Sequence, residues 1–254
     1  MERNVSPGAS VTAPPKGETD GPIEQSTLAA VEATGSRARS GHGELRRLPA
    51  VSGARTEDPI EGDQAVRVFV VRHGETLWSL NGCHTSTTDL PWTDNGRQRA
   101  EQLRPVLAKE TLALVLVSPM QRARQTCELA GLGSAAVSDA DLAEWNYGQY
   151  EWLTTQQIHE TAPDWVVFRD GCPGGETPEQ IGTRVDRVIA RASAVEGDVA
   201  LFAHAHVLRV LAARWIGFPV IAGEHFLLDT GTLCVLGYYR ETPAIEVWNR
   251  PVLG

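Results

Sequence analysis

A chain of 254 residues, 42% of them hydrophobic, is long enough to bury the core of one generous α/β domain or of two small ones. Its net charge of -9 argues against non-specific binding to nucleic acid or to an anionic membrane, because the average surface would repel phosphate groups. Any anionic substrate must therefore be held by a local cluster of positive groups.

The cysteines and the apolar runs indicate a cytoplasmic protein. No CxxC pair occurs among Cys83, Cys127, Cys172 and Cys234. This spacing predicts neither a disulfide framework nor a thiolate zinc site, and we expect reduced, buried thiols. The amino terminus has no charged-then-apolar signal segment, and no apolar run approaches the roughly 20 residues of a membrane helix.

The first quarter of the chain differs in composition from the rest. Residues 1–64 are rich in Gly, Pro, Ser, Thr and Ala and contain no Trp, Tyr or Phe. Such a segment buries too little apolar surface to offset its conformational entropy. We predict a disordered tail over residues 1–64 and a folded domain over residues 65–254.

Short runs rich in β-branched residues predict the strands of that domain. Three of them lack polar alternation, which is typical of strands covered on both faces: Val66–Val71, Leu112–Val117 and Val199–Ala203. Two later strands are expected at Gly231–Tyr239 and Ala244–Trp248, with a turn at Glu241–Pro243 between them, so the sheet should be mixed.

Helical segments lie between these runs. Thr93 or Asp94 can cap a helix that continues to Leu107. Thr177–Gln180 supplies an N-cap, a first-turn proline and a capping-box glutamine for a second helix, whose apolar face runs to Ala192. Strands that alternate with helices predict an α/β fold, a three-layer α/β/α sandwich with a mostly parallel sheet.

Each of the three apolar runs is followed by basic residues. Arg72 and His73 follow the first run, Arg122 comes shortly after the second, and His204 and His206 follow the third. A lone Arg or His at a strand end is more often a surface ion pair or a satisfied loop residue. In an open α/β sheet, however, ligands bind beyond the carboxyl ends of the strands, so three such groups in order predict an anion site.

A series of motifs in this order resembles the histidine phosphatase superfamily, which contains the phosphoglycerate mutases and many acid phosphatases. Arg72–Thr76 is similar to its RHGET signature. Five later segments of this chain resemble further motifs of the superfamily: Thr87–Thr93, Ser118–Thr126, Glu144–Gly148, Gly175–Thr177 and Phe202–His204. The resemblance covers roughly residues 66–248 and implies the phosphoglycerate mutase-like fold. Within the superfamily it points to broad-specificity acid and sugar-phosphate phosphatases such as the sedoheptulose-bisphosphatases.

The resemblance implies a metal-independent phosphatase with no cofactor, and His73 as its nucleophile. The attacking nitrogen must be unprotonated, so the other ring nitrogen of His73 should donate to a backbone carbonyl. Arg72, Arg122 and His204 would surround the non-bridging oxygens of the phosphate, where charge spreads in the transition state.

Glu144 is the implied general acid, which would later deprotonate the attacking water. Bound phosphate should raise the proton affinity of a neighbouring carboxyl, which favours an acidic or near-neutral optimum. Asp141 is the substitute if Glu144 points away from the site.

Substrate contacts are assigned to Ser79, Thr85, Ser86, Glu176 and His206. Ser79 lies where many relatives have an asparagine that touches phosphate. The other four have an ordinary alternative: Thr85 and Ser86 could form a polar turn, Glu176 could simply lead into a helix, and His206 could pack against its neighbours.

The sequence departs from the superfamily at Ala205 and Ser86, where relatives usually have glycine. An added side chain there would narrow the pocket, or cost strain if the backbone φ were positive.

Other functions remain open on the sequence alone. A phosphoglycerate mutase would return the phosphoryl group to a substrate hydroxyl, and a catalytically silent sensor would only bind a phosphorylated ligand. A metal on His204 and His206 is disfavoured, because no carboxylate or cysteine completes a ligand set. The expected partner is a small phosphorylated substrate, without nucleic acid or membrane, and a homo-oligomer is compatible with the sequence.

Overall fold

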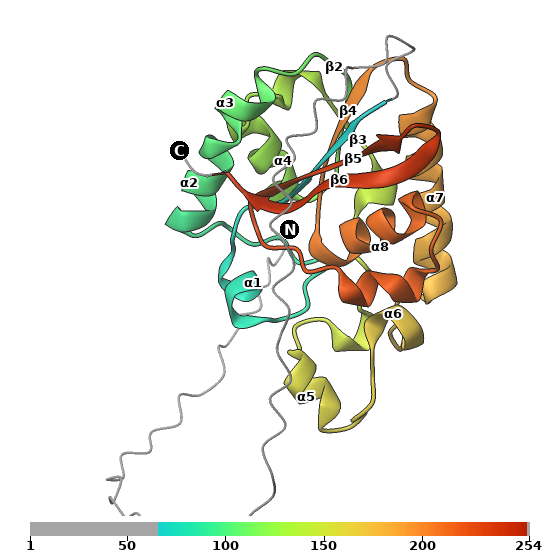
Figure 1. Ribbon diagram of the computed structural model, residues 1–254. Coiled ribbons are helices and arrows are strands. Elements are labelled where there is room, and N and C mark those ends of the chain that lie inside the picture. Colours follow the sequence, from blue (N-terminus) through green and yellow to red (C-terminus); the bar gives the residue numbers. More distant parts are fainter. Residues whose placement is uncertain (1–65, 253–254) are drawn as a thin grey trace, which may run out of the picture. The chain divides into compact units, whose positions relative to one another are not determined.

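The computed structural model describes residues 66–252 and shows a six-stranded sheet between two layers of helices (Figure 1). The predicted tail, residues 1–64, lies outside the described residues. The strands are β1 (Val68–Arg72), β2 (Leu112–Val117), β3 (Ala136–Ser138), β4 (Asp198–Ala203), β5 (Thr232–Tyr239) and β6 (Thr242–Pro251).

The strand order in the sheet is β3-β2-β4-β1-β5-β6. The first four strands in this order run parallel, whereas β5 is antiparallel to both β1 and β6. The sheet is therefore mixed and mostly parallel, as predicted.

Helices form the outer layers, with α2, α3 and α4 on one face of the sheet and α7 and α8 on the other (Figure 1). The helices are α1 (Leu77–Asn81), α2 (Asp94–Gln102), α3 (Arg104–Leu107), α4 (Gln121–Leu129), α5 (Thr155–His159), α6 (Val167–Asp170), α7 (Pro178–Ser193) and α8 (Ala205–Trp215). Short 3-10 turns lie at η1 (Gly133–Ala135), η2 (Ala140–Leu142), η3 (Gly148–Tyr150) and η4 (Val220–His225).

The side chains of the central strands enter two separate cores. Val68 and Val70 pack in the core beneath α7 and α8, whereas Phe69 and Val71 pack in the core beneath α2, α3 and α4. Because successive side chains point to opposite faces, a strand covered on both sides needs apolar residues throughout.

Two predicted boundaries are wrong. The helix expected to continue to Leu107 is divided at Leu103 into α2 and α3, because Pro105 has no N–H to donate to the preceding turn. The turn before the last strand is residues 240–241, and Pro243 already belongs to β6. An edge strand such as β6 tolerates a proline, because one of its sides forms no hydrogen bonds to a neighbouring strand.

The carboxyl ends of β1, β2 and β4 meet at one edge of the sheet. Backbone hydrogen bonds continue past the strands, from His73 N to Ala203 O at 2.9 Å and from Ser118 N to Phe202 O at 2.9 Å. The basic residues that follow the three strands are thereby brought to the same edge.

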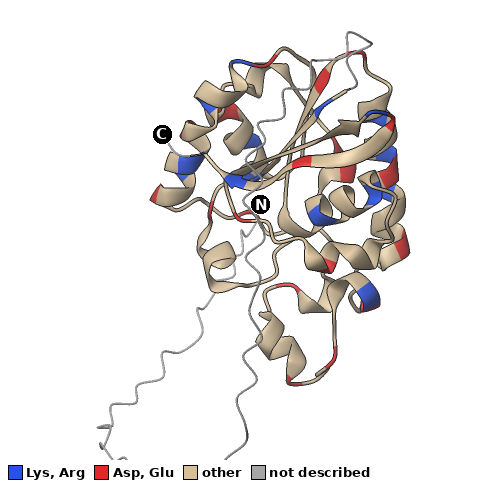
Figure 2. Ribbon diagram, viewed as in Figure 1, with Lys and Arg blue, Asp and Glu red and all other residues tan. Residues whose placement is uncertain are grey.

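Charged residues of both signs are interspersed along the helices and loops (Figure 2). Within residues 66–252, no helix has both the length and the apolar character needed to cross a membrane.

Candidate active site

A cavity of about 330 Å³ opens at this edge of the sheet. Most of the predicted site residues line it: Arg72, His73, Ser79, Thr85, Arg122, Glu144 and His206. His204, Ser86 and Glu176 do not belong to its lining. The predicted residues therefore gather at one cavity, except for these three, which lie outside its lining.

His73 is buried and its ring orientation is fixed. Its Nδ1 lies 2.8 Å from the carbonyl oxygen of Gly74, and because a carbonyl can only accept, Nδ1 carries the proton. This contact confirms the predicted hydrogen bond to a backbone carbonyl and leaves Nε2 unprotonated. Burial, followed by the charges of Arg122 and Arg72, holds the pKa of His73 well below its usual value.

Arg72 presents an unpaired donor. Its Nη1 donates to the carbonyl oxygen of Leu228, whereas the buried Nε finds no acceptor among residues 66–252. Burial lowers the pKa of the Arg72 guanidinium. Arg72 also lines the cavity, and its Nη2 makes no hydrogen bond within residues 66–252, so this group is available to an oxyanion there.

Arg122 is held almost completely by the protein. Its Nε donates to His204 Nδ1 at 3.1 Å, its Nη1 to Thr88 O at 2.9 Å, and its Nη2 to Thr85 O and Ser86 O at 3.1 and 3.2 Å. Of the five N–H donors of a guanidinium, these hydrogen bonds leave one, on Nη1, which also lies 3.9 Å from Asp89 Oδ1. The fork predicted to grip the phosphate is instead occupied by backbone carbonyls.

His204 lies behind His73, with ring centroids 5.1 Å apart. Because its Nδ1 accepts from Arg122, its Nε2 carries the proton and donates to Ser118 Oγ at 2.7 Å. Burial holds the pKa of His204 well below its usual value. With both nitrogens occupied, His204 could contact a phosphate only by giving up one of these partners.

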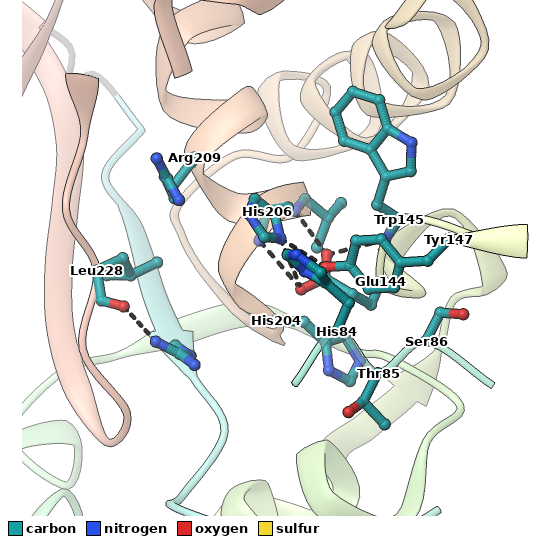
Figure 3. A network of polar contacts seen from close by, with 12 residues as sticks. His84, Thr85, Ser86, Glu144, Trp145, Tyr147, His204, His206, Arg209 and Leu228 are labelled. Carbon is teal, nitrogen blue, oxygen red and sulfur yellow. Dashed lines mark hydrogen bonds and ion pairs between the residues drawn. The ribbon is translucent and has the colours of Figure 1, made fainter. Parts of the chain in front are cut away.

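The carboxylate of Glu144 lies at the amino terminus of α8 and is drawn in Figure 3. It accepts from three backbone N–H groups: Trp145 N at 2.8 Å, Val207 N at 2.9 Å and His206 N at 3.0 Å. The partial positive charge of a helix amino terminus favours a carboxylate there. The backbone thus fixes Glu144 in the wall of the cavity.

Glu176 supports the loop that carries Glu144. Its carboxylate accepts from Arg184 Nε at 2.7 Å and Nη2 at 2.9 Å. Arg184 in turn donates to the carbonyls of Asp141, Ala143 and Glu144. The expected hydroxyl contact of Glu176 is therefore replaced by an ion pair that orders the Glu144 loop.

The Asp141 carboxylate contacts arginines of α7 and does not line the cavity. It pairs with Arg187 at 2.6 Å and Arg191 at 2.8 Å, and the hydrogen bond from Arg187 is the main cause of its lowered pKa. Since Glu144 faces the cavity, the substitute role considered for Asp141 is not needed.

Ser79 and Thr85 line the cavity, but both hydroxyls have partners within the protein. The Ser79 hydroxyl closes the capping box of α1 with Thr76. Ser86 is buried, and its hydroxyl donates to Glu151 at 2.6 Å. Of the neighbouring pair Thr85 and Ser86, only Thr85 lines the cavity.

Both departures from glycine are compatible with the backbone. Ala205 is the first residue of α8, and neither it nor Ser86 is among the residues with positive φ. The added methyl of Ala205 lines the cavity without strain in the backbone.

Sequence reasoning missed several residues of the cavity wall: His84, Tyr147, Arg209, Asp229 and Asn249. Arg209 could have been found, because it lies one helical turn after His206 on α8. No signal in the sequence indicates that Asp229 and Asn249 belong to the site, because Asp229 precedes β5 and Asn249 lies in β6. The two meet only in the folded protein, where the Asn249 amide donates to Asp229 at 3.0 Å.

His206, Tyr147 and His84 form a buried polar cluster beside Glu144 (Figure 3). His206 Nδ1 lies 2.5 Å from the Tyr147 hydroxyl, and the rings of His84 and Tyr147 are 4.8 Å apart. Burial lowers the pKa of His84 to about 4 and that of His206 well below its usual value. Within residues 66–252, no group of three or more His, Cys, Asp or Glu side chains could hold a metal ion.

The α/β fold and a cavity that holds a buried imidazole with an unprotonated nitrogen, arginines and a carboxylate are typical of enzymes that act on phosphate groups. The chain belongs to the histidine phosphatase superfamily (branch 1), whose sequence profile matches residues 68–251.

Known relatives agree with this assignment. The chain is 40% identical over 176 residues to an acid phosphatase of Mycobacterium tuberculosis, covering 68% of this chain and 86% of the relative. It is 37% identical over 188 residues to sedoheptulose 1,7-bisphosphatase of Saccharomyces cerevisiae, covering 61% and 69%. A solved structure of a Mycobacterium tuberculosis open reading frame superposes with a TM-score of 0.71 at 36% identity, covering 74% of this chain and 99% of the other.

Proposed function

We propose that this protein hydrolyses phosphomonoesters of small metabolites, such as sugar phosphates, through a phosphohistidine on His73. The observation that carries the proposal is that His73 and Arg72 line the same cavity. The first offers an unprotonated Nε2, because its Nδ1 is held by Gly74, and the second offers an Nη2 group without a hydrogen-bond partner in the described part of the chain.

The geometry supports a two-step reaction. His73 Nε2 attacks phosphorus, an N–P bond forms, the ester P–O bond breaks, and protonated Glu144 gives its proton to the leaving alkoxide. Water then attacks the phosphohistidine and gives its proton to Glu144, so that inorganic phosphate leaves and His73 is restored. Arg72 Nη2 and the remaining N–H of Arg122 would stabilise the charge on the equatorial oxygens.

The His73→Ala variant tests this assignment. It should lose phosphate release from sugar phosphates to the detection limit, because no nucleophile remains, while its circular dichroism stays that of the wild type. Release by the wild type without a bisphosphate primer would separate hydrolysis from a mutase reaction. Unchanged release by His73→Ala would refute the proposal.

A third arginine suggests which sugar phosphates are preferred. Arg209 donates to the carbonyls of Gly223 and Glu224 at 3.0 and 3.1 Å and lies 4.6 Å over the ring of Phe168. Among residues 66–252 it makes no ion pair with a carboxylate, although it lines the cavity. Because this charge is not neutralised by the protein, it favours a substrate with a second anionic group, in agreement with the bisphosphatase among the relatives.

Substitution of Arg209 by Met should therefore discriminate between substrates. We expect kcat/KM to fall about 10- to 100-fold for a sugar bisphosphate, which loses a charge-assisted hydrogen bond, and less than about 3-fold for a sugar monophosphate whose far end is neutral. Equal losses for the two substrates in a steady-state assay would contradict a role in recognising the second anion.

We also propose a cytoplasmic location, and the state of the cysteines supports it. Cys83, Cys127, Cys172 and Cys234 are all free thiols, as expected in a reducing compartment. Fractionation of cells that express the full chain tests it.

A further inference from the structure

The loop of residues 85–88, here called the 85–88 loop, is held from one side by a single carboxylate that the mechanism above does not use. Glu151 Oε1 accepts from three successive backbone N–H groups, those of Ser86, Thr87 and Thr88, at 2.9, 3.2 and 3.3 Å. Glu151 Oε2 accepts from the Ser86 hydroxyl at 2.6 Å. The backbone donors of these three residues therefore point to one negative charge.

The opposite side of the 85–88 loop faces a positive charge. The carbonyls of Thr85, Ser86 and Thr88 accept from the guanidinium of Arg122. The peptide groups that join Thr85 to Ser86 and Ser86 to Thr87 thus lie with their N–H ends toward Glu151 and their C=O ends toward Arg122. Peptide dipoles aligned in this way stabilise the carboxylate at their N–H ends and the guanidinium at their C=O ends, as a helix stabilises opposite charges at its two ends.

From this arrangement we propose that Glu151 is a positioning residue, which holds the 85–88 loop against Arg122 and thereby directs the remaining N–H of Arg122 toward the substrate phosphate. The proposal rests on the proposed function, since it concerns the same cavity. Glu151 itself does not line that cavity, so its effect on the reaction must pass through the loop.

The physical reason for an effect on catalysis is geometric. Without the carboxylate, the backbone donors of Ser86, Thr87 and Thr88 lose their acceptor, and the loop shifts to find water. Its carbonyls are the acceptors that orient the Arg122 fork, so the guanidinium shifts with them. Displacements of about 1 Å at a transition-state donor cost rates of the order of 100-fold, and the loss falls on kcat more than on KM.

Glu151→Ala and Glu151→Gln are the direct variants, with p-nitrophenyl phosphate as substrate. We expect kcat to fall about 10- to 100-fold in the Ala variant and less in the Gln variant, which keeps one oxygen acceptor. Asp186→Ala is the matched control, because it removes a carboxylate that accepts two hydrogen bonds from Arg214 far from the cavity. It should leave kcat unchanged.

A double-mutant cycle separates positioning from general damage. In an Arg122→Lys background, which has no guanidinium fork to orient, Glu151→Ala should lower kcat by a smaller factor than in the wild type. An equal or larger factor would overturn the proposal, because it would mean that Glu151 acts independently of Arg122. Thermal unfolding of each variant shows that the folded enzyme is being compared.

The outcomes also distinguish this proposal from the function on which it rests. A wild type that releases no phosphate would remove the proposed function. An active wild type whose Glu151→Ala variant keeps the same kcat would remove the positioning role of Glu151 alone.

Discussion

Glu144 illustrates how the backbone fixes a functional side chain. Its two carboxylate oxygens are held by N–H groups from two segments far apart in the sequence, one at Trp145 and one at the first turn of α8. Three fixed donors hold the Glu144 carboxylate in one orientation. Because Glu144 lines the cavity, it can exchange a proton with a group that is bound there.

At this residue scale we predict that Glu144→Gln affects substrates according to their leaving group. For a sugar phosphate, whose alkoxide needs a proton, kcat/KM should fall about 10²- to 10⁴-fold. For p-nitrophenyl phosphate, whose leaving group is stable without a proton, the loss in kcat/KM should be much smaller, because this ratio reports only the steps up to formation of the phosphohistidine. Steady-state kinetics with both substrates provide the measurement, and equal losses would argue against an acid role.

At the scale of elements, the turn after β1 is fixed by its contact with α2. The backbones of Gly74 and Gly96 approach so closely that a Cβ on Gly74 would lie 2.5 Å from Gly96 O, and one on Gly96 would lie 2.2 Å from Glu75 O. Thr93 N also donates to Glu75 O at 2.9 Å. Helix α2 therefore packs against the turn that follows His73 and holds that turn in place.

A methyl group at Gly96 should separate these elements. Gly96→Ala is expected to lower the free energy of unfolding by about 1 to 3 kcal/mol, because backbone atoms cannot give way as a flexible side chain does. It should also lower kcat, since the His73 turn moves. Arg97→Ala, on the exposed side of the same helix, should change stability by less than about 0.5 kcal/mol. Urea unfolding of both variants tests the difference.

Across the whole molecule, burial of histidines couples stability to pH. The pKa values of His73, His84, His204 and His206 are all lowered, in each case mainly by burial. Unfolding returns them to ordinary values, so the unfolded state binds more protons as the pH falls below about 6.5. Their contribution to stability is thus fully present above that pH and is lost as the pH falls.

For His84 the size of this effect can be given. A pKa that moves from 6.5 to about 4 corresponds to a loss on the order of 3 kcal/mol between these pH values. The free energy of unfolding in urea should therefore decline steadily from neutral pH to about pH 4, and His84→Gln should decline less steeply. A wild-type value that does not change with pH would contradict the prediction.

Local features of the sequence were enough to predict the framework. Unbroken apolar runs identify β1, β2 and β4, because strands covered on both faces bury every side chain. The capping box at Thr177–Gln180 marks the start of α7, because it satisfies backbone donors within one turn. The residues that follow the parallel strands predict the cavity, since such strand ends share one edge of the sheet.

Only the tertiary structure decided which partner each polar group takes. Glu176 meets Arg184 instead of a substrate hydroxyl, Arg122 donates to the 85–88 loop, and Glu151 accepts from a loop 63 to 65 residues earlier in the chain. Spacing along the chain carries no information about such pairs, because a hydrogen bond depends on ångström-scale geometry that exists only after the layers have packed. The sequence by itself therefore determined where the chemistry is located, and packing determined which side chains perform it and which hold them in place.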